Sequence, residues 1–276
     1  MTAAVENPQI ARRSHVTMPD ARLRFTGILR SELIKLTTLR STVWVLLVLL
    51  LVQIGMGVMA ALTVPVPPTG AGSAEAAGSF AVLISTIGVF FNQLVIAVLG
   101  VLVVSGEYST GQIRSTLTAV PTRQPVLVAK GLVFAATSFV VSLVAVVITY
   151  AATWPILESR VGASDLTDPA VWWPLIGAAG YLALVGLLSF SIGAIMRNTA
   201  AGIAVSVGLL LVVPIVLSLI GAEWASVVTE WLPSAAGQTL LGSGSVFEPW
   251  QALLVMLGWV AVPFVTASAL LARRDA

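Results

Sequence analysis

The segment 106–131, GEYSTGQIRSTLTAVPTRQPVLVAKG, is a densely polar stretch between two long apolar runs. Ser109 and Gln112 stand three residues apart, so the serine hydroxyl can accept the Gln112 amide while the glutamine side chain reaches back. This capping box predicts that a helix begins here. Pro121 lacks an amide hydrogen and biases the residue before it away from helical angles, so the helix should end there. The segment therefore predicts a short helix held outside the membrane between two spans.

The composition is that of an integral membrane protein. The 276 residues are 58% hydrophobic and 9% charged, with a mean hydropathy of +1.00, whereas soluble domains carry about 25% charged residues. No cysteine is present, which excludes disulfides, thiolate nucleophiles and cysteine metal sites. The one histidine, His15, lies in the polar N-terminal tail. A histidine zinc site or a Ser/His/Asp triad within the membrane is therefore not expected.

Residues 22–41 have the pattern of a basic amphipathic helix, with apolar residues at three- and four-residue steps. Such a helix next to a span is expected to lie in the cytoplasmic interface. Glu32 falls inside the apolar stripe, where a carboxylate is costly without a partner. We expect it to pair with an arginine of the polar segment, with Arg114 as the first choice; the alternative is a rotated helix that leaves Glu32 in water.

Six apolar runs follow, and each has the roughly 20 residues that a helix needs to cross a bilayer. They are 43–63, 80–104, 129–152, 173–196, 201–221 and 250–272. With a cytoplasmic N-terminus, every lysine and arginine except Arg160 falls on the inside, as the positive-inside rule requires. Both termini are therefore expected to be cytoplasmic. The sequence predicts an all-α integral membrane protein with six transmembrane helices.

Two outer segments differ in character. The first, 64–79, is rich in Pro, Gly and Ala and is predicted to be irregular. The last, 222–249, contains two short apolar pieces split by Trp231-Leu232-Pro233. Its many large apolar residues favour a re-entrant or interfacial hairpin over a solvated loop.

The deepest polar side chains are Gln53 in the first run and Asn92 and Gln93 in the second. Amides in hydrocarbon seek partners, so these three either form interhelical hydrogen bonds or line a substrate path. Glu107 lies where the second run leaves the membrane. It is either an ordinary interfacial charge or a group that fixes the polar segment by pairing with Arg114 or with a basic residue of a partner protein. Tyr108 would then anchor at the headgroups or protrude into a groove of a partner.

Several classes of chemistry lack their motifs. The chain has no Gly-x-x-x-x-Gly-Lys-Ser/Thr phosphate loop, so it cannot hydrolyse ATP by that route. It has no His-Glu-x-x-His and no inward carboxylate pair for ion coupling, which disfavours a secondary transporter. We expect a non-catalytic chain with no cofactor, no metal and no nucleic-acid partner.

The sequence resembles the ABC-type-2 permeases, the membrane subunits of ATP-binding-cassette exporters, over nearly its whole length. Three motifs carry the resemblance: Ser31-Glu32-Leu33-Ile34-Lys35-Leu36 before the first span, Gly106-Glu107-Tyr108-Ser109-Thr110-Gly111 followed by Arg114, and Pro121-x-Arg123 leading to Lys130. The second motif is the most specific. Gln112 departs from the small residue that the family often has there, although it completes the capping box.

The resemblance implies a bacterial plasma-membrane exporter in which two permease copies, or a permease and a paralogue, pair and a separate ATPase binds ATP and Mg. It implies alternating access for a hydrophobic or lipid-like substrate. The implied division is a disordered tail, 1–21, a connecting helix, 22–41, and a transmembrane domain, 42–276, with a coupling loop, 105–127, and an outer hairpin, 222–249. The implied coupling residues are Gly106, Glu107, Tyr108, Ser109, Thr110, Gly111, Gln112, Arg114, Pro121, Arg123 and Lys130, with Glu32 and Lys35 on the connecting helix. The alternatives are an ATP-independent secondary transporter and a non-transporting membrane partner subunit.

Overall fold

The computed structural model describes residues 25–66, 74–109, 111, 123–162, 168–244 and 246–273. Within these ranges every regular element is a helix, which confirms the all-α prediction. The elements are α1 Phe25–Thr38, α2 Arg40–Thr63, α3 Ala74–Thr86, α4 Val89–Ser109, α6 Arg123–Val161, α7 Pro169–Met196, α8 Thr199–Val207, the π-helical turn η2 Gly208–Val212, α9 Val213–Ile220, α10 Glu223–Glu230, α11 Pro233–Leu240 and α12 Pro249–Arg273.

Six helical segments are long and apolar enough to cross a membrane. They are Arg40–Thr63, Ala74–Tyr108, Gln124–Val161, Pro169–Met196, Thr199–Ile220 and Pro249–Ala272. The shortest has 22 residues, which at 1.5 Å per residue spans about 33 Å, slightly more than the hydrocarbon core. Each of the six predicted runs is therefore confirmed as a helical segment long and apolar enough to span a membrane, which agrees with a multi-pass membrane protein.

The second span is broken where the sequence predicted one continuous run. α3 ends at Thr86 and α4 begins at Val89, with a turn at Ile87 and Gly88 between them. Gly88 allows the close approach of α2, because a Cβ there would lie 2.9 Å from the Cα of Gln53. α3 also begins at Ala74, so the prediction of an irregular segment up to residue 79 is wrong for its last six residues.

The third span is much longer than its apolar run. α6 has 39 residues and continues through Pro155 into the region predicted to be an outer loop. Its extension packs on the bundle through the buried Leu157 and Val161. Arg160, the one predicted outer cation, donates to the carbonyl oxygens of Ala61 and Val64, the latter at 2.9 Å. A cation on the last carbonyls of a helix is favourable, so Arg160 ties α6 to the end of α2.

α7 forms the centre of the bundle and packs against α4, α6 and α12. In its most apolar stretch 72% of the residues are buried, whereas the corresponding value for the fifth span is 11%. Gly100 of α4 is needed for this packing, because a Cβ there would collide with the carbonyl oxygen of Gly186. Phe134 of α6 and Phe190 of α7 stack with ring centroids 6.1 Å apart.

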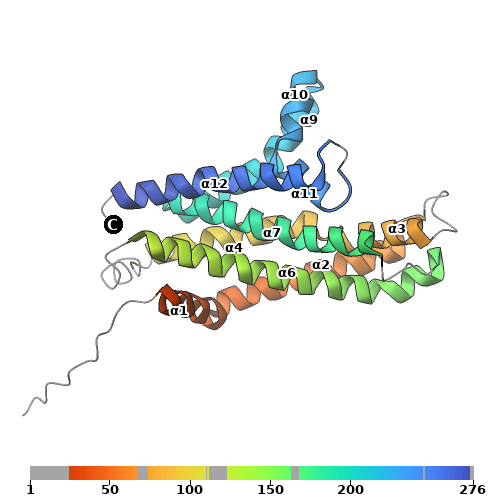
Figure 1. The fold of residues 1–276 in the computed structure, drawn as a ribbon, viewed down its shortest axis with the longest axis horizontal. Helices are drawn as coiled ribbons and strands as arrows, with labels where there is room; N and C mark the ends of the chain where they lie inside the picture. The colour runs from red at the N-terminus through yellow and green to blue at the C-terminus, as the bar shows by residue number, and fades with distance from the viewer. Residues whose placement is uncertain are drawn as a thin grey trace, which may run out of the picture.

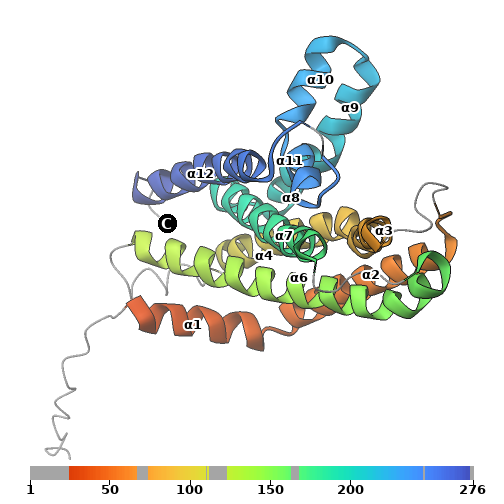
Figure 2. The ribbon, with the colours of Figure 1, turned by 45° about the vertical axis from the view of Figure 1, so that its right-hand side comes forward.

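The fifth span divides into a packed half and a projecting half. α8 packs on α4 and α7, but α9 has no buried residue. Between them lies the π-helical turn η2, and Pro214 follows at the start of α9; both features interrupt regular α-helical bonding. α9 and α10 project from the bundle in both ribbon views (Figures 1 and 2).

The predicted outer hairpin contains two short helices, α10 and α11, with Trp231 and Leu232 between them, where the sequence split its two apolar pieces.

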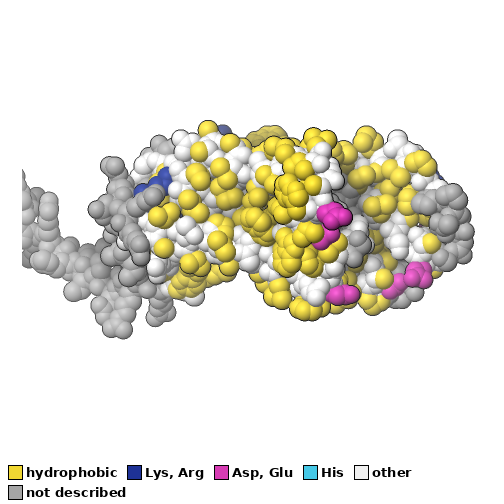
Figure 3. Space-filling view, turned by 90° about the horizontal axis from the view of Figure 1, so that it is seen from above, with side chains coloured by type: hydrophobic (Ala, Val, Ile, Leu, Met, Phe, Trp, Pro, Cys, Tyr) yellow, Lys and Arg dark blue, Asp and Glu magenta, His cyan; other side chains and the backbone are white. Residues whose placement is uncertain are grey.

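Seen from above, hydrophobic side chains cover much of the visible surface. The visible lysine and arginine side chains lie mainly at one end, and acidic ones lie nearer the other (Figure 3).

Candidate functional site

Four charged side chains from three helices meet at one end of the bundle. α1 supplies Glu32 and Lys35, α4 supplies Glu107 near its last turn, and α6 supplies Lys130. These two lysines are the only lysines in the chain. We call the four residues the charge ring.

The charge ring is closed, and its signs alternate. Lys130 Nζ lies 2.6 Å from Glu32 Oε2 and 2.7 Å from Glu107 Oε1. Lys35 Nζ lies 2.8 Å from Glu32 Oε1 and 3.2 Å from Glu107 Oε1. The compact ammonium group of lysine, with three donors, suits a position between two carboxylates. Each lysine therefore bonds both glutamates, and the net charge of the ring is zero.

Three members of the ring are buried. Their exposed fractions are 2% for Glu32, 6% for Lys130 and 8% for Glu107, whereas 28% of the Lys35 side chain is exposed. Of the two orientations that the sequence left open for Glu32, the structure has the buried one. The helix α1 turns Glu32 and Leu36 inward but leaves Leu33 about half exposed, so only part of the predicted apolar stripe is buried.

Burial and pairing act in opposite directions on the two α1 groups. Burial alone raises the pKa of Glu32, but Lys130 and Lys35 outweigh it and hold that pKa below its ordinary value. For Lys35, burial lowers the pKa, but the hydrogen bond to Glu32 and the charge of Glu107 outweigh it and raise that pKa. Both groups are therefore charged at neutral pH.

The expected pairing of Glu32 and Glu107 with Arg114 is not tested, because Arg114 lies outside the described residues. In the described part of the chain both carboxylates bond to Lys35 and Lys130. The sequence signal was present, because Lys130 is a lone cation at the apolar edge of a span, but periodicity could not join positions 98 residues apart along the chain.

The capping box predicted at Ser109 is wrong. Ser109 is the last residue of α4, and Gly111 follows with φ +72°, a left-handed conformation that ends a helix and does not begin one. The Gly111 amide donates to the carbonyl oxygen of Tyr108 at 3.3 Å. The glycine after the polar cluster therefore terminates α4, because few other residues adopt its backbone angles.

Tyr108 contacts its own chain, and its expected contact with headgroups or a partner stays a prediction. It is half-buried, and the Arg197 guanidinium lies 5.3 Å from its ring centroid, a cation–π distance. Arg197 ends α7 with φ 51°. Nearby, the Thr199 hydroxyl donates to Ser105 Oγ at 2.9 Å. The turn between the fourth and fifth spans is thereby attached to the end of α4.

The other predicted coupling residues are only partly described. Gly106 is the last glycine in α4 and lines a pocket beside the ring. Arg123 is the first residue of α6. Thr110, Gln112, Arg114 and Pro121 lie outside the described residues, together with the predicted coupling helix.

The buried amides form hydrogen bonds between helices. Asn92 Nδ2 donates to Gln53 Oε1 at 2.8 Å and to the Leu49 carbonyl at 3.1 Å, and Gln53 Nε2 donates to the Ser85 carbonyl at 2.8 Å. Gln53 and Asn92 thereby join α2 to α3 and α4, which is the packing role.

Gln93 lies in a different environment. It accepts a hydrogen bond of 2.5 Å from the Tyr181 hydroxyl of α7, and both residues line a pocket of about 230 Å³ under α11. Gln93 therefore lines a pocket in addition to joining α4 to α7.

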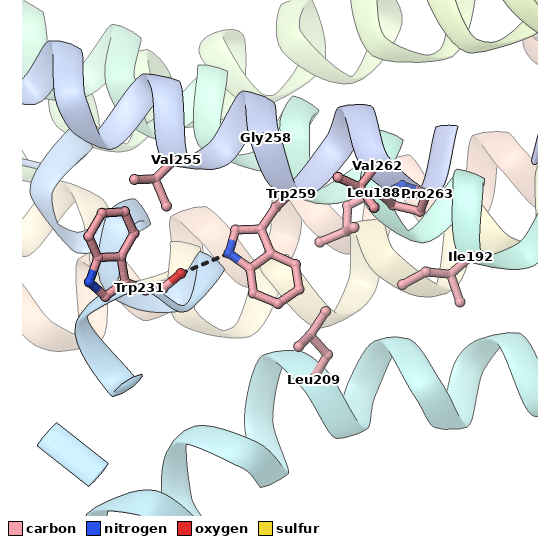
Figure 4. A pocket seen from close by; sticks show the side chains of 9 residues that line it. All are labelled: Leu188, Ile192, Leu209, Trp231, Val255, Gly258, Trp259, Val262 and Pro263. Atoms are coloured by element: carbon pink, nitrogen blue, oxygen red, sulfur yellow. Dashed lines mark hydrogen bonds between the residues drawn. The ribbon is translucent and has the colours of Figure 1, made fainter. Parts of the chain in front are cut away.

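A larger and almost wholly apolar pocket of about 640 Å³ lies between α7, η2 and α12. Leu188, Leu209 and Val262 line it, and the Trp259 indole donates to the Trp231 carbonyl oxygen at 2.7 Å at one side (Figure 4). Its volume is in the range of small-molecule sites.

In the ranges that the structure describes, no three His, Cys, Asp or Glu side chains gather as metal ligands would. Compared with models of known protein families and with curated proteins, the chain matches none. The resemblance to ABC-type-2 permeases therefore remains a prediction.

Proposed function

We propose that this chain is the membrane permease subunit of an ATP-driven exporter, and that the charge ring couples its spans to a separate ATPase. The observation that carries the proposal is that the ring joins α1 to the two helices that flank the segment between α4 and α6. Glu107 precedes this segment and bonds to Lys35 of α1, and Lys130 follows it and bonds to Glu32 of α1. Both flanks of one loop are thus fastened to the same helix.

We infer that this arrangement transmits a force on the loop to the three helices. Removing one partner from a buried ion pair costs about 3–5 kcal/mol, so a force on the loop moves α1, α4 and α6 together before it opens the ring. This coupling can drive transport only if another protein applies a force to the loop. The chain has no phosphate loop of its own, so we infer that a partner ATPase, with ATP and Mg, supplies the force.

The remaining parts of the proposal concern placement. With an even number of spans, both termini lie on one side, and the ribbon has α1 and the end of α12 at the same end (Figure 1). We propose that this is the cytoplasmic side of a bacterial plasma membrane, that α1 is the interfacial connecting helix, and that a second permease copy or paralogue completes the transporter by alternating access. The 640 Å³ apolar pocket supports a hydrophobic or lipid-like substrate.

The decisive experiment is a mild-detergent pull-down of the tagged chain, with mass spectrometry of the proteins that co-purify. We expect a soluble ATPase with a phosphate loop to accompany the wild type. Glu107→Gln should keep the complex and basal ATP hydrolysis but lose transport in proteoliposomes, because the ion pairs of Glu107 with Lys35 and Lys130 are removed. Glu223→Gln on the exposed start of α10 is the matched control and should transport normally.

Absence of an ATPase in several detergents would refute the exporter assignment. Full transport by Glu107→Gln would refute the proposal that the charge ring couples the helices to the ATPase. The orientation has its own test with an impermeant thiol reagent. A cysteine introduced at position 114 should stay unlabelled from outside, while Glu223→Cys should be labelled; labelling of position 114 from outside would contradict the topology.

A further inference from the structure

A pocket of about 290 Å³ opens beside the charge ring at the elbow between α1 and α2. All four ring residues line one end of it, together with Ser41. Apart from Thr42 and Gly106, its other walls are apolar side chains, namely Leu36, Leu39, Val45, Leu99, Leu102 and Val103. One pocket thus combines a charged end with hydrocarbon-like walls, which is the chemistry that fits an amphiphile.

A second hollow of about 400 Å³ continues along the same seam between α2 and α4. Its lining side chains are all apolar, and Val45 belongs to both hollows. On α4 the two hollows together extend from Gly106 to Leu94, a rise of about 18 Å along a helix. One leaflet of hydrocarbon is about 15 Å thick. The groove therefore has the length of one lipid tail.

We propose that this groove binds one phospholipid, with its phosphodiester at Lys35 and one acyl chain between α2 and α4. Lys35 is the most exposed member of the ring and gives two of its three N–H groups to Glu32 and Glu107. The ring is neutral, so an added anion meets no excess negative charge. The exposed Arg40 and Ser41 lie at the same elbow and add a cation and a hydroxyl donor.

The tail half suits a hydrocarbon chain. Apart from the indole N–H of Trp44, the side chains that line it offer no donor or acceptor, so most of a polar ligand would lose its hydrogen bonds to water there without replacement. A phospholipid meets both requirements, because its oxyanion lies at headgroup depth and its chains enter the bilayer. The site needs only the placement of the six helices in a membrane, and not transport.

Native mass spectrometry of the purified full chain tests the proposal with two probes, phosphatidylglycerol and a diacylglycerol with the same chains. We expect one phosphatidylglycerol per chain to resist delipidation. Its affinity should exceed that of diacylglycerol by about tenfold, the effect of one charge-assisted hydrogen bond.

Variants separate the two halves of the site. Val98→Trp and Leu102→Trp fill the groove and should each abolish the retained lipid. Lys35→Gln should remove the preference for phosphatidylglycerol. Val265→Trp, on a side chain of α12 that is 65% exposed and outside these hollows, should bind as the wild type does.

Two results would overturn the proposal. One is equal retention of both probes by the wild type, since the phosphodiester would then contribute nothing to the affinity. The other is a retained phosphatidylglycerol in both groove variants when their melting temperatures match the control, since the lipid would then bind elsewhere.

Discussion

Replacing Lys130 by methionine tests the charge ring most directly. The side chain is 7% exposed, and its ammonium contacts the carboxylates of Glu32 at 2.6 Å and Glu107 at 2.7 Å. In Lys130→Met these two carboxylates share only Lys35. Removing one partner of a buried pair costs about 3–5 kcal/mol, which for a chain of this size lowers the melting temperature by on the order of 10 °C.

Thermal unfolding in detergent measures this loss. Because the chain has no cysteine, unfolding is followed by light scattering or by the fluorescence of a dye that does not need to react with a thiol. Arg40→Met, at an exposed cation outside the ring, is the control and should melt within about 2 °C of the wild type. The double variant Lys130→Met/Glu107→Gln restores neutrality and should recover about 2 kcal/mol, as expected for residues of one network. If Lys130→Met melts like the control, or if the double variant recovers nothing, the ring does not hold these helices together.

Three further predictions follow from other contacts. Because the pKa of Glu32 lies below its ordinary 4.5 and that of Lys35 above its ordinary 10.5, their stabilisation should be complete between these pH values. It should be lost as the pH falls through the lowered pKa or rises through the raised one. The difference in melting temperature between wild type and Glu32→Gln/Lys35→Gln, measured against pH, should therefore form a plateau; a slope between pH 5 and 9 would contradict this. Gly177→Ala should destabilise by about 1–3 kcal/mol, because its Cβ would collide with the Leu240 carbonyl, whereas Gly258→Ala, with open space around it, should not; equal melting temperatures would refute the packing of α7 on α11. Gln53→Leu should cost about 1–3 kcal/mol by leaving the buried Asn92 amide short of a partner, and Gln53→Leu/Asn92→Leu should be the more stable of the two; the reverse order would remove the reason given for this pair.

Much of the architecture follows from local sequence properties. A run of about 20 apolar residues can satisfy its backbone in hydrocarbon only as a helix, so the six spans and the all-α class could be predicted from composition and length. The break of the outer hairpin at Trp231-Leu232-Pro233 was also visible, because proline cannot continue a helix. The sequence likewise identified Glu32, Lys35, Glu107 and Lys130 as candidate site residues.

Boundaries were less predictable. The third apolar run ends at residue 152, but α6 continues through Pro155 to Val161, where the buried Leu157 and the contacts of Arg160 with the end of α2 keep the helix intact. At Ser109 a serine–glutamine spacing suggested a helix start, but Gly111 adopts a left-handed conformation that closes α4. Both errors arose where a local signal competed with tertiary contacts or with an adjacent glycine.

The sequence by itself determined the membrane character, the number of spans and the residue types available for a site, since each depends on hydropathy, length and composition. Only the tertiary structure decided which charges meet. Glu32 and Lys130 are 98 positions apart in the sequence and 2.6 Å apart in space, and no local pattern encodes that distance. It depends on how α1 rotates against α4 and α6, and the burial of two carboxylates fixes that rotation, because each needs an ammonium partner once water is excluded.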